Sequence, residues 1–339
     1  MKRILYLDGL KCLAILLVVM GHCIQRSYVA MDPETDAFYY DSIFKFIYGC
    51  HMPLFITISG FFFYNSLQKY SFKDLIKSRF LKLIVPIIAW HIIWMITDGF
   101  SNQGEGYTMV SFVAGFLKQY WFLWAVFYCS IVVLFVEGLI KERIKLIIYS
   151  LLIVLSLFLP NILNIDRYVY LFPFYLIGFL YCKYCRDFEC KNTRVIMGLG
   201  GGIFIYAALL MLFTYSDYIY TTGTCIIRGG SVSRSQLGID VFRFVVGFVG
   251  VVSFYGLAFC CRNLNVPRWI SNVGSKTLGI YIIHMFFTPI ISHYSISVNY
   301  FIILLEATIL ITISYFLTVL IEKSNILGAL LLGKQAPKK

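Results

Sequence analysis

The chain has 339 residues, of which 60% are hydrophobic and only 14% are charged, and its mean hydropathy is +0.79. Soluble domains carry about 25% charged residues, so this composition excludes an ordinary soluble protein and any large soluble domain. The formal net charge of +12 could suit a nucleic-acid-binding protein, but its distribution along the chain favours membrane topology. We therefore expect no nucleic-acid partner.

Apolar stretches long enough to cross a bilayer recur from one end of the chain to the other. They predict an all-α, polytopic transmembrane bundle of about ten helices. The first stretch has the charged start of a signal peptide, but Lys11 interrupts it and no Ala-x-Ala-like cleavage site follows, so we expect a retained helix. The predicted helices span residues 4–24, 43–66, 80–97, 120–138, 144–160, 168–184, 195–214, 239–261, 272–292 and 299–321.

The basic residues alternate with this helix pattern. With the N-terminus in the cytoplasm, segments 1–3, 67–79, 139–143, 185–194, 262–271 and the tail hold most of the Lys and Arg, and the first outer loop is acidic. This asymmetry is the positive-inside rule, and it predicts that both termini are cytoplasmic. We expect one transmembrane domain over residues 4–321, a basic tail over 322–339 and contacts with membrane lipids. The sequence leaves open whether the protein forms a homo-oligomer.

Three ionisable residues lie in or beside the first apolar helix. Lys11 and His22 are eleven residues apart, which is three turns plus about 20°, so they share a face and lie roughly 16 Å apart along the axis. Asp8 precedes Lys11 by three residues, on the same face. Charges in hydrocarbon are costly and therefore functional candidates. There is a structural alternative for each residue. His22 could be hydrogen-bonded to a nearby carbonyl, and the side chain of Lys11 could snorkel to the membrane interface.

Two more imidazoles lie in predicted helices. His51 has a predicted depth similar to that of His22, so the two could line one cavity, and His284 ends an apolar run in the ninth helix. The alternative is a hydrogen-bonded packing role. In the helix of His51, Pro53 predicts a kink and Gly60 predicts a close helix contact.

Other motifs allow a functional and a structural interpretation. Lys73, Lys77 and Arg79 could meet nucleotide phosphates or act as a topology signal beside anionic lipid. Trp121 could stack on a sugar ring or belong to an aromatic belt. Residues 221–235, which are rich in Gly, Ser and Thr, form a loop that either lines an acceptor site or only connects helices.

The ten cysteines do not predict a disulfide framework, because most lie within helices or on the predicted cytoplasmic side, where thiols stay reduced. Cys182, Cys185 and Cys190 have a spacing that could suggest a metal or redox site. No histidine is near them and only one pair has the spacing of metal ligands. We therefore predict no metal site.

Several motifs follow one another in an order that resembles the acyltransferase-3 family of bacterial integral-membrane acyltransferases. The first is Asp8-Gly9-Leu10-Lys11 followed by His22, with Lys11 where the family more often has Arg. The others are His-Met-Pro-Leu-Phe at 51–55 with Ser-Gly-Phe at 59–61, the basic segment from Arg79 to Pro86, Trp-Phe-Leu at 121–123, Phe174 to Gly178, and Tyr-Ile-Ile-His at 281–284.

This resemblance implies an enzyme of the bacterial inner membrane that moves an acyl group, most often acetyl, from cytoplasmic acyl-CoA to a hydroxyl of a surface glycan or lipid-linked sugar. Acetyl-CoA would be a co-substrate, with no tightly bound cofactor. The alternative is a transporter or flippase for an anionic or sugar substrate, since intramembrane charges also suit a permeation path. The implied roles are catalytic for His22 and Asp8, donor-binding for Lys11, Lys73, Lys77 and Arg79, and acceptor-binding for His51, Trp121 and His284.

Overall fold

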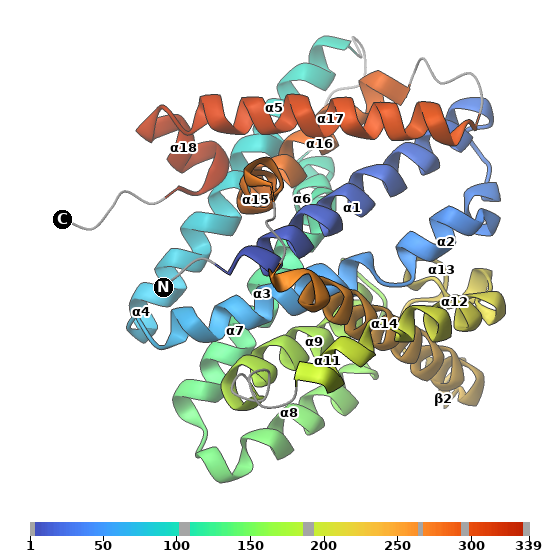
Figure 1. Cartoon of the computed structure of the whole chain (residues 1–339), viewed down its shortest axis with the longest axis vertical. Coiled ribbons are helices and arrows are strands. Elements are labelled where there is room, and N and C mark those ends of the chain that lie inside the picture. Colours follow the sequence, from blue (N-terminus) through green and yellow to red (C-terminus); the bar gives the residue numbers. More distant parts are fainter. Residues whose placement is uncertain (1–3, 102–108, 186–192, 264–266, 293–297, 335–339) are drawn as a thin grey trace.

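The computed structural model describes residues 4–101, 109–185, 193–263, 267–292 and 298–334, which form a bundle of helices. Helix α1 runs through the middle of the bundle and packs against α3, α14, α15, α16 and α17 (Figure 1). The first half consists of α1 (Leu5–Met31), η1 (Ala37–Tyr40), α2 (Ser42–Tyr48), α3 (His51–Leu67), α4 (Phe72–Arg79), η2 (Phe80–Ile84), α5 (Val85–Ser101), α6 (Met109–Gln119), α7 (Trp121–Leu139) and α8 (Glu142–Ser156).

The second half contains the only two strands of the described residues, β1 and β2, which pair antiparallel as a short hairpin within the predicted 221–235 loop. Its elements are α9 (Ile165–Leu180), η3 (Tyr181–Cys185), α11 (Thr193–Leu199), α12 (Gly202–Leu212), η4 (Tyr215–Asp217), α13 (Ile219–Thr222), β1 (Ile227–Arg228), β2 (Ser231–Val232), α14 (Arg234–Cys260), η5 (Cys261–Asn263), α15 (Arg268–Ser275), α16 (Thr277–Ser292), α17 (Tyr300–Ile321) and α18 (Asn325–Leu332).

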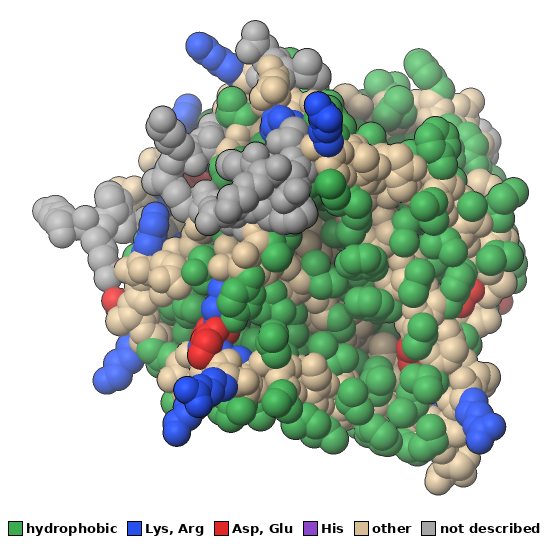
Figure 2. Space-filling view, turned by 60° about the horizontal axis from the view of Figure 1, so that its bottom comes forward, with side chains coloured by type: hydrophobic (Ala, Val, Ile, Leu, Met, Phe, Trp, Pro, Cys, Tyr) green, Lys and Arg blue, Asp and Glu red, His purple; other side chains and the backbone are tan. Residues whose placement is uncertain are grey.

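The protein is a multi-pass membrane protein of the all-α class, with one short hairpin. Seven of the described helical segments are long and apolar enough to cross a bilayer, and hydrophobic side chains cover much of the face in Figure 2. Each of the ten predicted ranges contains a helix, but the number that crosses the membrane and the sides of the termini stay predictions. The seven segments are Leu5–Met31, Ser42–Leu67, Phe72–Thr97, Trp121–Leu139, Arg194–Leu212, Arg234–Asn263 and Tyr300–Ile321.

Two of these segments are irregular, and each irregularity has a local cause. The segment Ser42–Leu67 is interrupted between α2 and α3 at Gly49 and Cys50, which precede Pro53, the position of the predicted kink. Pro53 instead lies in the first turn of α3, where its missing N–H leaves no hydrogen bond broken. In the third segment, Pro86 has no N–H to donate to Lys82, and a π-helical turn, η2, joins α4 to α5 at this point.

Helices α3 and α9 touch backbone to backbone through two glycines. A Cβ on Gly60 would lie 2.1 Å from the carbonyl oxygen of Tyr175, and a Cβ on Gly178 would lie 1.9 Å from that of Thr57. Both distances are shorter than any real contact, so only glycine fits at either position. The predicted close approach at Gly60 is therefore confirmed, and the contact fixes the position of α3 against α9.

Candidate functional site

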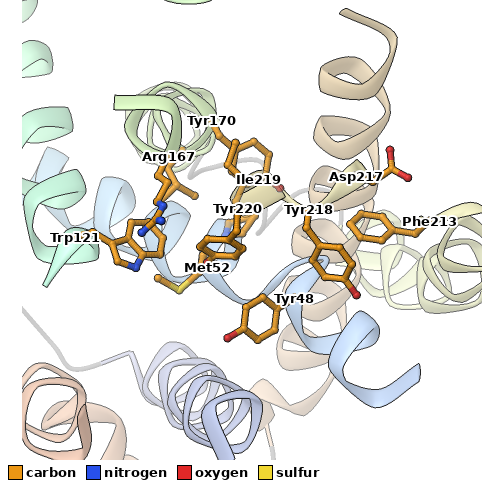
Figure 3. A pocket seen from close by; sticks show the side chains of 12 residues that line it. Tyr48, Met52, Trp121, Arg167, Tyr170, Phe213, Asp217, Tyr218, Ile219 and Tyr220 are labelled. Atoms are coloured by element: carbon orange, nitrogen blue, oxygen red, sulfur yellow. The ribbon is translucent and has the colours of Figure 1, made fainter. Parts of the chain in front are cut away.

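A cavity of about 290 Å³ lies at the end of the bundle where α1 carries His22. We call it the histidine cavity because His22 and His51 both line it, as their predicted depths allowed. A narrow extension shares part of its wall, with Arg167 beside Trp121 (Figure 3). The lining residues are His22, Gln25, Phe38, Tyr39, Phe44, Tyr48, His51, Met52, Trp121, Arg167, Tyr220, Tyr281 and Met285.

His22 is half-buried in the wall of this cavity and makes no hydrogen bond to any other described residue. The carbonyl partner that a structural role would give it is therefore absent from the described part of the chain. Its ring centroid lies 5.5 Å from that of His284. His22 thus presents an uncommitted imidazole to the cavity, with a second imidazole behind it.

His51 and His284 are held in one and the same way. The Nδ1 of His51 lies 2.9 Å from the carbonyl oxygen of Ile47, and the Nδ1 of His284 lies 2.9 Å from that of Ile280. A carbonyl only accepts, so each Nδ1 carries the proton and each Nε2 is a free acceptor when the ring is neutral. The Nε2 of His284 is buried without a hydrogen-bond partner among the described residues, which is a costly arrangement.

Asp8 and Lys11 lie toward the opposite end of α1. The Nζ of Lys11 is 3.2 Å from Oδ1 of Asp8 and 4.0 Å from the ring centroid of Phe62. Ser271 donates a 3.4 Å hydrogen bond to Oδ2 of Asp8. Since Lys11 and His22 are about 16 Å apart along the helix, Asp8 is placed to orient Lys11 and does not reach His22.

The three cations of α4 that were predicted to bind the donor do not lie in one environment. Lys73 and Lys77 are exposed, and Lys77 lines a separate cavity of about 380 Å³. Arg79 turns inward instead, with its guanidinium carbon 4.6 Å from the ring centroid of Phe63. The structure therefore brings Lys11 and Arg79 to successive phenylalanines of α3 and leaves Lys73 and Lys77 on the exposed side of α4.

An apolar cavity of about 160 Å³ lies beside α3, between its two ends. Its wall contains Leu54, one turn from His51, and Phe61, next to the phenylalanine that contacts Lys11. Leu7 and Leu10 of α1 also line it, and no polar surface is exposed to it. This cavity therefore lies along α3 in the part of the bundle between Lys11 and the histidine cavity, and neither Lys11 nor His22 lines it.

Arg167 was not among the predicted site residues. Its guanidinium carbon lies 5.2 Å from the ring centroid of Trp121 and 5.0 Å from that of Tyr220. The sequence offered a weak signal, because Arg167 follows Asp166 directly at the start of an apolar helix. It could not show that Trp121 and Tyr220, 46 residues before and 53 after, would flank the guanidinium.

The loop that carries Tyr220 is anchored by a buried arginine of α14. Arg243 donates to the carbonyl oxygens of Gly223 and Ser216 at 2.8 and 3.2 Å, and to Oγ1 of Thr222 at 2.5 Å. It also pairs with Asp240 at 3.4 Å. The loop residues that line the cavities are 213 and 217–220 rather than the predicted 221–235.

The tyrosines beside Arg167 stay neutral at physiological pH. Burial raises the pKa of Tyr39 to about 12, and Asp36 adds to this rise although Arg167 opposes it. Burial likewise raises the pKa of Tyr220, again against the effect of Arg167. Neither phenol can therefore supply a negative charge to balance the guanidinium.

The predicted cysteine cluster is only partly described. Cys182 is buried and accepts a 3.6 Å hydrogen bond from Asn65, Cys185 is exposed, and Cys190 lies outside the described residues. Among the residues that the structure describes, no three His, Cys, Asp or Glu side chains gather as a metal site would require.

Comparison with known proteins places the chain in a family. A family model described as "Acyltransferase domain" (Acyl_transf_3) matches residues 4–322. The chain is 31% identical over 186 residues to the nodulation protein NolL of Mesorhizobium japonicum, covering 54% of this chain and 48% of that protein. It is 30% identical over 198 residues to the NolL of Sinorhizobium fredii, covering 57% and 52%.

The chain thus spans about half the length of these curated relatives. No solved structure matches it. The family model nevertheless covers nearly the whole chain, from the start of α1 to the end of α17. The resemblance predicted from the motifs is confirmed, and the chain belongs to the acyltransferase-3 family.

Proposed function

We propose that this protein is an O-acyltransferase of the bacterial inner membrane. It transfers an acyl group, with acetyl the first choice, from cytoplasmic acyl-CoA to a hydroxyl of a surface glycan or lipid-linked sugar. The observation that carries the proposal is the uncommitted imidazole of His22 in a cavity walled by aromatic side chains. Such walls suit the apolar faces of a sugar, and the imidazole suits its hydroxyl.

In the proposed reaction, the neutral His22 removes the proton of the acceptor hydroxyl while the oxygen attacks the thioester carbon. The C–S bond breaks, the ester C–O bond forms, and the CoA thiolate takes up the proton. The other route passes through an acyl group carried on His22 itself. Both routes place positive charge on His22, and the free Nε2 of His284 is an acceptor toward which the His22 side chain can turn an N–H.

The donor would bind at the Lys11 end of α1. Lys11 and Arg79 supply two positive charges there for the phosphates of CoA, and Asp8 orients Lys11. The thin pantetheine arm would then lie along the apolar cavity beside α3, with its thioester end directed toward His22. Lys73 and Lys77, being exposed, could contribute only long-range attraction to the donor.

A transfer assay tests the proposal. Purified protein in proteoliposomes, given acetyl-CoA labelled in the acetyl group and a glycan extract as acceptor, should form a labelled, alkali-labile ester. His22→Ala should abolish this product while the protein inserts and purifies normally. Movement of solute without any labelled ester would support the transporter alternative and overturn the proposal, as would full activity of the variant.

A further inference from the structure

Arg167 is the single charged side chain among the described residues that line the histidine cavity. The other lining groups are two imidazoles, an amide, two thioethers and neutral aromatic rings. The narrow extension also touches Asp217, but that carboxylate accepts hydrogen bonds from the N–H and hydroxyl of Thr214 at 2.7 and 2.8 Å. Figure 3 shows its side chain directed away from Arg167. Arg167 is therefore the permanently charged group that the described residues present to the cavity.

The donors of Arg167 are not consumed by its surroundings. Its Nε is buried without a hydrogen-bond partner in the described part of the chain, and no described carboxylate forms an ion pair with its guanidinium. Asp166, its neighbour in the chain, interacts with it electrostatically but at no ion-pair distance. A buried donor without a partner is costly in a folded protein, whereas the flanking rings of Trp121 and Tyr220 fix the plane of the guanidinium without using its N–H groups.

The backbone before Arg167 holds it in place. Leu163 and Asn164 both have left-handed conformations, with φ of 49° and 62°, and Asn164 donates a 3.3 Å hydrogen bond to the carbonyl oxygen of Leu117. Arg167 follows in the first turn of α9, a helix of 16 residues. The helix dipole adds positive potential at this end, which the carboxylate of Asp166 in the same turn offsets in part, so the guanidinium is the main source of positive charge here.

From these observations we infer that Arg167 binds a negatively charged group of the acceptor, a sugar carboxylate or a phosphate. This inference rests on the proposed function and names the class of acceptor: an acidic rather than a neutral saccharide. The planar guanidinium donates two N–H groups to two oxygens of the anion. The sugar ring then lies along Trp121 and Tyr220, in the same cavity as His22.

Binding without any acyl donor tests this inference. Isothermal titration calorimetry in detergent micelles would compare methyl glucuronide, glucose 1-phosphate and methyl glucoside, which carry a carboxylate, a phosphate and no charge. The purified protein should bind one of the two anions at least tenfold more tightly than methyl glucoside. The preferred anion shows whether the site is made for an acidic sugar or for a sugar phosphate.

Variants then assign the preference to one side chain. Arg167→Gln should bind all three probes alike, and Arg167→Lys should keep part of the preference because it keeps the charge without the planar fork. Arg234→Gln removes an exposed arginine at the start of α14, outside the cavity, and should bind as the unchanged protein does. Should Arg167→Gln fail to fold, the reduced preference of Arg167→Lys decides.

Equal affinity for the three probes, no measurable binding of either anion at millimolar concentration, or an anion preference that survives in Arg167→Gln would each overturn the inference. Because no acyl-CoA is present, a failure of the proposed transfer reaction leaves this result unaffected. The reverse also holds, since a neutral saccharide that becomes acylated would contradict the acidic acceptor and leave the acyltransferase proposal intact.

Discussion

The imidazoles of His22 and His284 lie with their ring centroids 5.5 Å apart, on α1 and α16. His284 is fully buried, and its proton is fixed on Nδ1 by the carbonyl of Ile280. Its Nε2 is buried and has no hydrogen-bond donor among the described residues. A carboxylate is the usual partner of a catalytic histidine, and in the proposed reaction the imidazole of His284 would take that part.

His284→Phe should lower kcat for acyl transfer at least tenfold and leave the KM for the acceptor nearly unchanged. The phenyl ring keeps the shape of the buried side chain but removes the acceptor that stabilises positive charge on His22, an effect confined to the transition state. The measurement is the steady-state kinetics of labelled ester formation. His284→Gln, which can place an amide oxygen near the same point, should recover part of kcat. A variant changed only in KM would show a binding role instead.

Lys11→Ala should raise the KM for acyl-CoA roughly tenfold, the scale of one charge-assisted hydrogen bond, with little change in kcat. Lys11→Arg should keep near-normal values, since the charge stays and the guanidinium grips phosphate at least as well. Kinetics at varied acyl-CoA concentration measure both. Lys73→Ala provides the comparison for an exposed lysine, and an equal rise in KM for both variants would assign the effect to surface charge alone.

Gly178→Ala should destabilise the protein by about 1–3 kcal/mol, the usual cost of overpacking. Its Cβ would lie 1.9 Å from the backbone oxygen of Thr57, so α3 and α9 would have to separate. Thermal unfolding in detergent measures the loss. Gly238→Ala is the matched control: it lies on α14 with nothing within 4 Å of the new Cβ, and alanine is the better helix former, so its melting temperature should stay level or rise.

An ion-pair cluster at the α7–α8 junction should make stability depend on pH. Glu142 accepts hydrogen bonds from Lys145 at 2.7 Å and Tyr184 at 2.6 Å and lies 2.7 Å from the Nζ of Lys183. These partners, with Lys145 foremost, lower the pKa of Glu142 to about 2. The stabilisation is therefore present above the ordinary pKa of a Glu, about 4.3, and disappears as the pH falls from there toward 2.

Glu142→Gln should melt slightly below the unchanged protein at pH 7, and the two melting temperatures should converge as the pH falls toward 2. The difference should be small because the side chain is 56% exposed. Glu34→Gln removes an exposed carboxylate outside this cluster and should show no such convergence. A difference for Glu142→Gln that is constant with pH would show that its charge is not involved.

The residues on one helix face were the part of the site that could be predicted from the sequence. Helical geometry alone placed Asp8 beside Lys11 and put His22 about three turns away, and the observed ion pair agrees. Shared predicted depth was enough to suggest one cavity for His22 and His51. These inferences needed only the helical repeat and the order of membrane crossings.

The contribution of Arg167 could not be predicted in this way. Its meaning depends on Trp121 and Tyr220, which come from elements that are close only in the folded bundle. Lys73, Lys77 and Arg79 show the converse: they are close in the sequence, but their side chains point to different surroundings once α4 forms. Side-chain partners from distant segments are set by packing, which no local pattern encodes.

The glycine contact between α3 and α9 also limits how the cavity can open. His51 belongs to α3 and Arg167 to α9, and the close backbone contact at Gly60 and Gly178 holds these two helices together as one wall of the cavity. His22 and His284 belong to α1 and α16, which pack against each other on the opposing side. We therefore expect entry of an acceptor to displace the α1–α16 pair or the 213–220 loop rather than to separate α3 from α9.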